Sequence, residues 1–282
     1  MFPMRIGGFI GSAVVAVLVG VSSPAVAADA PSVRARSAYV VDSTGTIHFG
    51  KRETKRAPVA SLVKIMTAYV VLREARLSDT IKITATDVRY AASGGAATAG
   101  LRAGERFTVR DLLYALMLPS GADAANALAR RYGPGKTAFV AKMNRTAHDL
   151  GLADTRYTNA DGMPTPANGG YSTAVDQARL AYRALGSGTF MTVVGKETHK
   201  VAKTAVHRAH TWRNTNKLLS RADGVLGVKT GYTRAAGYCL LFAGERNGRL
   251  VVGVLLGESA DDRRFTTAER LLDHAGRQIT LA

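Results

Sequence analysis

The sequence predicts an α+β fold in which one antiparallel sheet, built from both ends of the chain, is flanked by helices and carries a mostly helical insertion. Strand-like segments lie near the N-terminus and in the last third, whereas apolar residues recur at helical spacing between roughly residues 75 and 190. The 282 residues, of which 46% are hydrophobic, suffice for one sizeable core. We therefore expect two lobes with a ligand site at their junction.

The N-terminal part of the sheet is expected to be a hairpin. Residues 37–41 and 46–49 read as strands, and the turn-forming residues 42–45 lie between them. A helix with apolar residues at helical spacing then runs from Ser61 to about Leu72.

Capping residues locate the helices of the middle segment. Thr108 precedes one helix, and a second covers residues 123–131. A third, amphipathic helix covers residues 139–147, and Ser172 is expected to cap a fourth helix that runs through Leu185.

The last third of the chain returns to strands. The expected strands cover residues 227–231, 237–244 and 250–256. Asn247 and Gly248 supply a hairpin turn between the last two. A final helix runs from about residue 264 to 275, and no further C-terminal domain is expected.

The first 27 residues have the layout of a secretory signal peptide. Arg5 supplies a positive charge, Gly7–Val21 is almost wholly apolar, and the small residues Ala25–Ala27 form a cleavage site. The apolar run is shorter than the roughly 20 residues of a spanning helix, although a retained anchor remains the alternative. We expect residues 28–282 to be exported and to act outside the cytoplasm.

Charge and cysteine content narrow the classes of partner. A formal net charge of +17 favours association with an anionic cell envelope, whereas scattered basic residues and only 7% aromatics disfavour nucleic acid. The single cysteine, Cys239, lies in an apolar run, which favours a buried and inert thiol. His207 and His210 have no further metal ligands nearby in sequence and are interpreted as an exposed basic turn. We expect no metal and no cofactor.

A serine and a lysine at the start of the first long helix carry the chemistry. Ser61 and Lys64 are three residues apart and share one helix face, so the amine lies beside the hydroxyl. A serine needs an adjacent base, and lysine is a base only when burial or a neighbouring cation lowers its pKa. Ile65 and Met66 follow directly, which indicates that Lys64 is embedded in apolar surroundings.

Two further motifs follow in the chain. Ser120 lies in a Ser-Gly-Ala turn between two helices, and Lys229, Thr230 and Gly231 end a strand. A strand that ends in glycine lets a substrate backbone lie close alongside. Each motif alone is typical of an ordinary turn or strand end, but the three in this order form the set found in penicillin-binding proteins and class A β-lactamases.

The sequence resembles the low-molecular-mass penicillin-binding D-alanyl-D-alanine carboxypeptidases, a family of serine DD-peptidases. The matching stretches are Pro58–Tyr69, Leu112–Ala129, Asn214–Leu219 and Gly227–Leu240. The resemblance implies the DD-peptidase/β-lactamase-like fold and removal of the terminal D-alanine of peptidoglycan stem peptides, with β-lactam antibiotics as covalent inhibitors.

The resemblance also implies roles. Ser61 is the acylated nucleophile, Lys64 is its proton acceptor, and Ser120 and Lys229 complete the proton path to the departing D-alanine. The backbone N–H groups of Ser61 and Tyr232 form the oxyanion hole. Substrate-binding roles fall to Lys229, Thr230, Gly231, Tyr232 and Arg264. Thr230 and Arg264 hold the terminal carboxylate, although Arg263 adjoins Arg264 in the sequence.

One departure from the family's motifs leaves alternatives open. Ala122 stands where the family usually has asparagine, so a weakly active penicillin-binding wall protein is one alternative. A DD-transpeptidase with the same acyl-enzyme is another. A class A β-lactamase is disfavoured, because no glutamate lies between Glu105 and Glu197 to activate a deacylating water.

The cleavage site predicts that the exported protein begins at Ala28. N-terminal sequencing of secreted material checks this, and an intact Met1 in the membrane fraction would instead identify an anchor.

Overall fold

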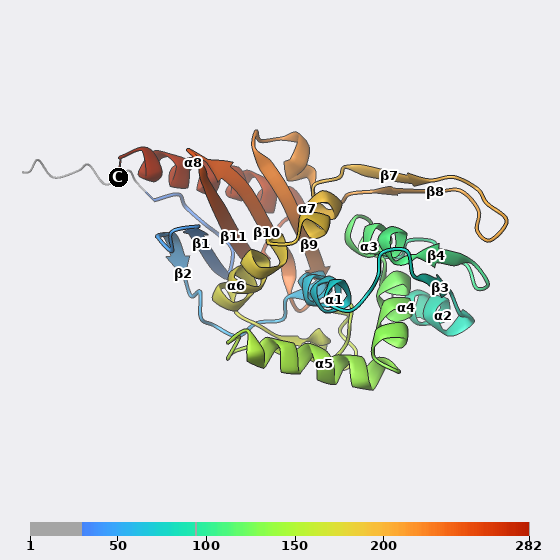
Figure 1. Cartoon of the computed structure of the whole chain (residues 1–282). Helices are drawn as coiled ribbons and strands as arrows, with labels where there is room; N and C mark the ends of the chain where they lie inside the picture. Colours follow the sequence, from blue (N-terminus) through green and yellow to red (C-terminus); the bar gives the residue numbers. More distant parts are fainter. Residues whose placement is uncertain (1–29, 94, 282) are drawn as a thin grey trace, which may run out of the picture.

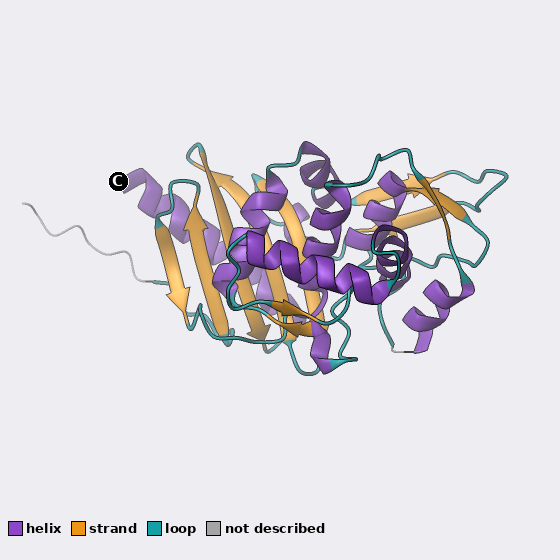
Figure 2. Cartoon of the chain, turned by 60° about the horizontal axis from the view of Figure 1, so that its bottom comes forward, coloured by secondary structure: helices purple, strands orange, loops and turns teal. Residues whose placement is uncertain are grey.

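The structure, a computed structural model, describes residues 30–93 and 95–281. Its centre is a five-stranded antiparallel sheet with the strand order β2-β1-β11-β10-β9, and helices pack on both faces (Figures 1 and 2). The sheet strands are β1 (Ser37–Asp42), β2 (Ile47–Lys51), β9 (Val225–Thr233), β10 (Gly237–Arg246) and β11 (Arg249–Glu258). The α+β fold with a sheet from both chain ends is therefore confirmed.

Local turn chemistry explains how the strands are joined. The Asp42 carboxylate accepts hydrogen bonds from the backbone N–H groups of Thr44 (2.8 Å) and Thr46 (3.1 Å), which closes the turn between β1 and β2. Asn247 and Gly248 have φ values of 49° and 76°, as a two-residue hairpin turn requires. The pairing of β1 with β11 joins the two chain ends in one sheet.

Helices pack against both faces of this sheet, and further helices lie to one side of it (Figure 1). The helices are α1 (Val63–Leu72), α2 (Ala85–Ser93), α3 (Val109–Met117), α4 (Ala122–Tyr132), α5 (Lys136–Asp149), α6 (Ala174–Leu185), α7 (Gly188–Val194) and α8 (Asp261–Leu281). Three two-stranded sheets accompany them: β3 (Thr80–Lys82) with β4 (Arg106–Thr108), β5 (Arg156–Tyr157) with β6 (Gly170–Tyr171), and β7 (Thr198–Val201) with β8 (His210–Arg213).

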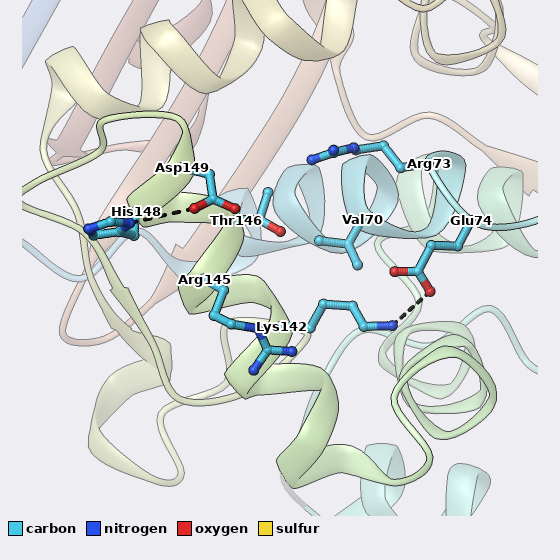
Figure 3. Close-up of a pocket in the computed structure, with 8 residues that line it drawn as sticks. All are labelled: Val70, Arg73, Glu74, Lys142, Arg145, Thr146, His148 and Asp149. Atoms are coloured by element: carbon cyan, nitrogen blue, oxygen red, sulfur yellow. Dashed lines mark hydrogen bonds and ion pairs between the residues drawn. The ribbon is translucent and has the colours of Figure 1, made fainter.

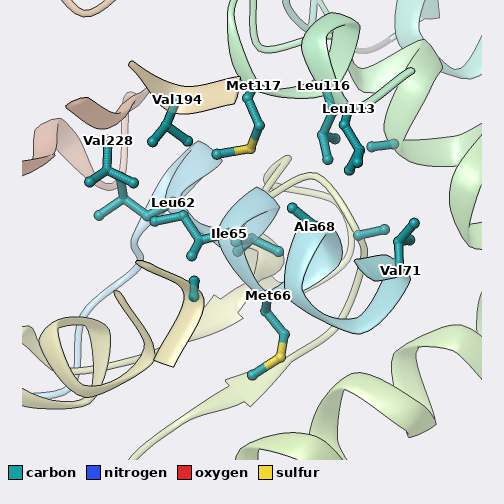
Figure 4. Packing of buried hydrophobic residues seen from close by; sticks show 14 of the residues in the cluster. Leu62, Ile65, Met66, Ala68, Val71, Leu113, Leu116, Met117, Val194 and Val228 are labelled. Atoms are coloured by element: carbon teal, nitrogen blue, oxygen red, sulfur yellow. The ribbon is translucent and has the colours of Figure 1, made fainter. Parts of the chain in front are cut away.

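Two hydrophobic cores lie on opposite faces of the sheet. On one face, α8 packs Phe265 and Leu272 against Phe242 of β10. On the other face, α1 is buried along almost its whole length, and its Ile65 and Met66 are fully inaccessible. Figure 4 shows this helix surrounded by apolar side chains from α3, α7 and β9. The helix that carries Lys64 is therefore the centre of the larger core.

Two expectations about the middle of the chain were wrong. The cap of α6 is Thr173, whose side chain accepts from the Asp176 N–H, because the Ser172 hydroxyl is engaged with Thr155 instead. The region of His207 and His210 is not an exposed turn, since His210 lies buried on β8 with Nε2 3.2 Å from Oε1 of Glu105. Glu105 lies far away in sequence, so no local pattern indicated this contact.

Three further points concern Cys239, the predicted signal peptide and membrane-spanning helices. Cys239 is fully buried, as expected, and burial raises the pKa of its thiol to about 11. The predicted signal peptide lies outside the described residues. None of the helices in the described part of the chain combines the length and the apolar character that a membrane span requires.

The cap of α3 predicts a stability effect. The Thr108 side chain accepts from the Asp111 N–H, so Thr108→Ala should lower the free energy of unfolding by about 1 kcal/mol. Urea denaturation measures this, with Thr108→Ser as a control that keeps the cap. Equal losses in the two variants would contradict the assignment.

Candidate active site

A pocket of about 810 Å³ lies where the first turn before α1, the loop before α4 and strand β9 meet. Of the residues singled out in the sequence, the pocket is lined by Ser61, Lys64, Ser120, Thr230, Gly231, Tyr232 and Arg264. Segments that are far apart in the chain therefore converge on one cavity, and Lys229 lies buried next to it.

Ser61 and Lys64 form the centre of the pocket. Ser61 lies in the 3₁₀ turn η1 (Ala60–Leu62), and α1 follows directly with Lys64 in its first turn. Lys64 Nζ donates to Ser61 Oγ (2.9 Å) and to the main-chain oxygen of Asp161 (2.7 Å). Only 1% of Lys64 is exposed, and this burial lowers the pKa of its amine to about 8, against the opposing charges of Asp161 and Asp123. An amine with a pKa in this range can accept a proton from an adjacent hydroxyl near neutral pH.

Two glycines allow the chain to pack tightly around the Ser61 turn. A Cβ on Gly162 would lie 1.9 Å from the main-chain oxygen of Ala60, and one on Gly231 would lie 3.1 Å from the Ser61 nitrogen. The sequence suggested that Gly231 makes room for substrate, and the structure adds that it makes room for the nucleophile's own backbone. Ala60 itself has a φ of 50°, a left-handed conformation that non-glycine residues rarely adopt.

Lys229 and Thr230 occupy adjacent positions on β9 but have different surroundings. Lys229 is 1% exposed, and its Nζ donates to the main-chain oxygen of Thr230 (3.0 Å). Burial, together with the positive charges of Lys64 and Arg264, places the pKa of Lys229 well below its usual value. The Thr230 hydroxyl lies on the pocket side, 2.6 Å from the hydroxyl of Thr215. Thr215 was missed as a site residue, although it lies in the matching stretch 214–219.

Ser120 reaches the pocket from the loop before α4. Its φ of 64° is left-handed, and its hydroxyl is buried without a hydrogen-bond partner among the described residues. An unsatisfied buried hydroxyl in a strained residue is typical of a group kept for a ligand or a proton path. Ala122 begins α4 fully buried and does not line the pocket.

The side chains of the neighbouring residues Arg263 and Arg264 have different surroundings. Arg264 is buried, lines the pocket, and donates from Nη1 to the main-chain oxygens of Gly231 (3.1 Å) and Cys239 (3.2 Å). Asp261 pairs with its other terminal nitrogen. Arg263 points instead to the surface, where it contacts Ser259. Of these two arginines, only Arg264 lines the pocket.

A second pocket, of about 550 Å³, lies between α1 and α5 and carries no comparable chemistry (Figure 3). Its charged side chains are largely paired with one another: Lys142 with Glu74 at 2.7 Å, and His148 with Asp149 at 3.5 Å. Its lining includes the Thr146 hydroxyl and the His148 ring, but no hydrogen bond joins these two groups in the described part of the chain. The pocket at Ser61 is therefore the candidate active site.

The pocket at Ser61 has the features of a serine acyl-transfer site: a serine hydroxyl, a buried amine that is hydrogen-bonded to it and a second buried lysine. Comparisons with known proteins agree with this class. The profile of the D-alanyl-D-alanine carboxypeptidase family matches residues 24–260. A curated relative, the D-alanyl-D-alanine carboxypeptidase of Streptomyces sp. strain K15, is 38% identical over 266 residues, which cover 90% of this chain and 91% of the relative.

Two further comparisons extend this similarity. DacF of Bacillus subtilis, also a D-alanyl-D-alanine carboxypeptidase, is 31% identical over 86% of this chain and 62% of its own length. The crystal structure of the Streptomyces K15 DD-transpeptidase superimposes with a TM-score of 0.83 at 36% identity, covering 88% of this chain and 98% of that one. The chain therefore belongs to the D-alanyl-D-alanine carboxypeptidase family, and the prediction of a serine peptidase of this class is confirmed.

Proposed function

We propose that the protein is a serine-type carboxypeptidase that removes the terminal D-alanine of peptidoglycan stem peptides through an acyl-enzyme on Ser61. The observation that carries the proposal is the 2.9 Å hydrogen bond between the buried amine of Lys64 and the Ser61 hydroxyl, at the bottom of a pocket between sheet and helices.

Acylation begins at the Ser61 hydroxyl. Its oxygen attacks the carbonyl carbon of the terminal D-Ala-D-Ala bond, while neutral Lys64 takes the proton. The backbone N–H groups of Ser61 and Tyr232 are proposed to donate to the oxyanion of the tetrahedral intermediate. Gly231, which directly precedes Tyr232, allows β9 to lie close to the Ser61 nitrogen.

Release of D-alanine needs a proton at the leaving nitrogen. We assign its delivery to Ser120, whose buried hydroxyl has no other partner in the described part of the chain, together with Lys229. Burial and the charges of Lys64 and Arg264 hold the pKa of Lys229 well below its usual value, so its amine gives up a proton more readily than an exposed lysine does. Water then hydrolyses the Ser61 ester and restores the enzyme.

Substrate binding is proposed to use the free edge of the sheet. β9 is the last strand in the sheet order, so an extended peptide can add to it by main-chain hydrogen bonds. Thr230 and Arg264 are assigned to the terminal carboxylate, because both line the pocket beyond Ser61. The same carboxylate is present in β-lactam antibiotics, which we expect to acylate Ser61 as covalent inhibitors.

The proposed place of action is outside the cytoplasm, at the cell wall, at the outer face of the membrane or in the secreted fraction. Peptidoglycan lies there, and the predicted signal peptide supports export. The formal net charge of +17 supports peripheral association with an anionic cell envelope.

A labelled penicillin should bind covalently to the peptide that contains Ser61, and Ser61→Ala should abolish the label. Mass spectrometry of the digested adduct checks the site, and release of D-alanine from a diacyl-Lys-D-Ala-D-Ala peptide checks the reaction. A label that persists in Ser61→Ala would assign the nucleophile elsewhere.

Arg264→Ala should lower kcat/KM for the peptide by roughly ten- to a hundredfold, because it removes a charge-assisted hydrogen bond of about 1.5–3 kcal/mol. The matched control is Arg263→Ala, which removes the adjacent surface arginine and should change kcat/KM little. Steady-state kinetics of both variants measure this difference. Equal losses of kcat/KM in the two variants would contradict the assignment of Arg264 to the carboxylate site.

A further inference from the structure

Asp161 lies directly behind the proposed base, on the loop that follows β5. Its main-chain oxygen accepts from Lys64 Nζ (2.7 Å), and the preceding residue, Ala160, accepts from the Thr67 hydroxyl (2.6 Å) through its own main-chain oxygen. Both bonds fasten this loop to α1. The Asp161 side chain is consequently held beside the site, with only 1% of the residue exposed.

The carboxylate of Asp161 is only half satisfied. Its Oδ1 accepts from the Met163 N–H (3.0 Å), whereas its Oδ2 is buried and has no hydrogen-bond partner within the described residues. Asp123, the other carboxylate near Lys64, accepts with both oxygens from the backbone N–H groups of Ala99 (2.9 Å) and Leu101 (3.1 Å). Asp123 thus has a structural task in holding that loop, and the free oxygen of Asp161 has none.

Two lysines lie near this carboxylate. Lys64 of α1 donates to the Asp161 main-chain oxygen, and Lys136 of α5, whose Nζ lies 4.0 Å from the ring centre of Tyr90, interacts electrostatically with Asp161. Tyr90 of α2 places its hydroxyl 3.5 Å from Asp161 Oδ1. Burial lowers the pKa of both Lys64 and Lys136, and the negative charge of Asp161 opposes this in each case.

We propose that Asp161 is an electrostatic positioning residue of the acylation step, whose buried negative charge keeps Lys64 a strong enough base to take the Ser61 proton. The inference rests on the proposed function of Lys64. Burial alone would make Lys64 a weak base, and proton transfer is most efficient when the pKa of the base lies near the working pH. The negative charge of Asp161 raises the pKa of Lys64, and in this proposal Asp161 does not contact the substrate.

The test is the pH dependence of acylation in Asp161→Asn. Asparagine keeps the main-chain bond to Lys64 and can still accept from Met163, so the substitution removes charge and little else. Acylation of the wild type by benzylpenicillin should rise with pH through the pKa of Lys64, near 8. Because a negative charge raises the pKa of a neighbouring amine, its loss should move this acid limb down by about one pH unit and lower the plateau rate severalfold.

Matched variants separate charge from structure. Asp161→Glu keeps the charge and should retain the wild-type limb, as should Tyr90→Phe, which removes only the hydroxyl that contacts Asp161. Thermal unfolding shows whether each variant folds. If the asparagine variant does not fold, Asp161→Ser, a smaller neutral acceptor, repeats the measurement.

The outcomes also separate this inference from the proposed function. A wild type with a Ser61 adduct and an acid limb that stays in place in folded Asp161→Asn overturns the role of Asp161 and leaves the function intact. A lower plateau with an unmoved limb shows a purely structural role and overturns it equally. A wild type that forms no adduct on Ser61 contradicts the function, and the inference with it.

Discussion

Burial of the Lys64 amine against the Ser61 hydroxyl is the interaction on which the rest of the site depends. A lysine on an exposed helix would remain protonated and inert at neutral pH. Here α1 is the centre of the larger core, and the apolar side chains that stabilise the fold also remove water from Lys64. The stability of the fold and the lowered pKa of Lys64 therefore have the same physical source. A substitution that loosens the packing of α1 would also rehydrate the amine.

The same constraint explains why the backbone around Ser61 is so crowded. A desolvated amine needs hydrogen-bond partners that are themselves fixed, and main-chain groups supply them with little conformational freedom. The loop that ends in Gly162 brings the Asp161 oxygen to Lys64, and Gly231 brings β9 to Ser61. A side chain at Gly162 would clash with the Ala60 main chain, and one at Gly231 would lie tightly against the Ser61 nitrogen. The two glycines thus connect the geometry of the site directly to the packing of the lobes.

Sheet topology determines from which side a substrate can approach. Because β9 is the outermost strand of the sheet, one of its edges pairs with no other strand. Arg264 reaches β9 from α8, where its Nη1 donates to the main-chain oxygen of Gly231. Arg264 is held by the main-chain oxygens of Gly231 and Cys239, which belong to neighbouring strands. Its position therefore depends on correct pairing of β9 with β10, which links the proposed carboxylate site to the register of the sheet.

The sequence by itself determined the elements and the core chemistry. Apolar periodicity located α1, the Asn247–Gly248 turn located the final hairpin, and the spacing of Ser61 and Lys64 placed amine and hydroxyl on one face, because these are local consequences of helix and turn geometry. Tertiary structure alone decided which of Arg263 and Arg264 faces the pocket and brought Thr215, Asp161 and Glu105 to their partners. The contacts of Asp161 with Lys64 and of Glu105 with His210 join residues about a hundred positions apart, so they depend on how the layers pack, and no local pattern of residues encodes that.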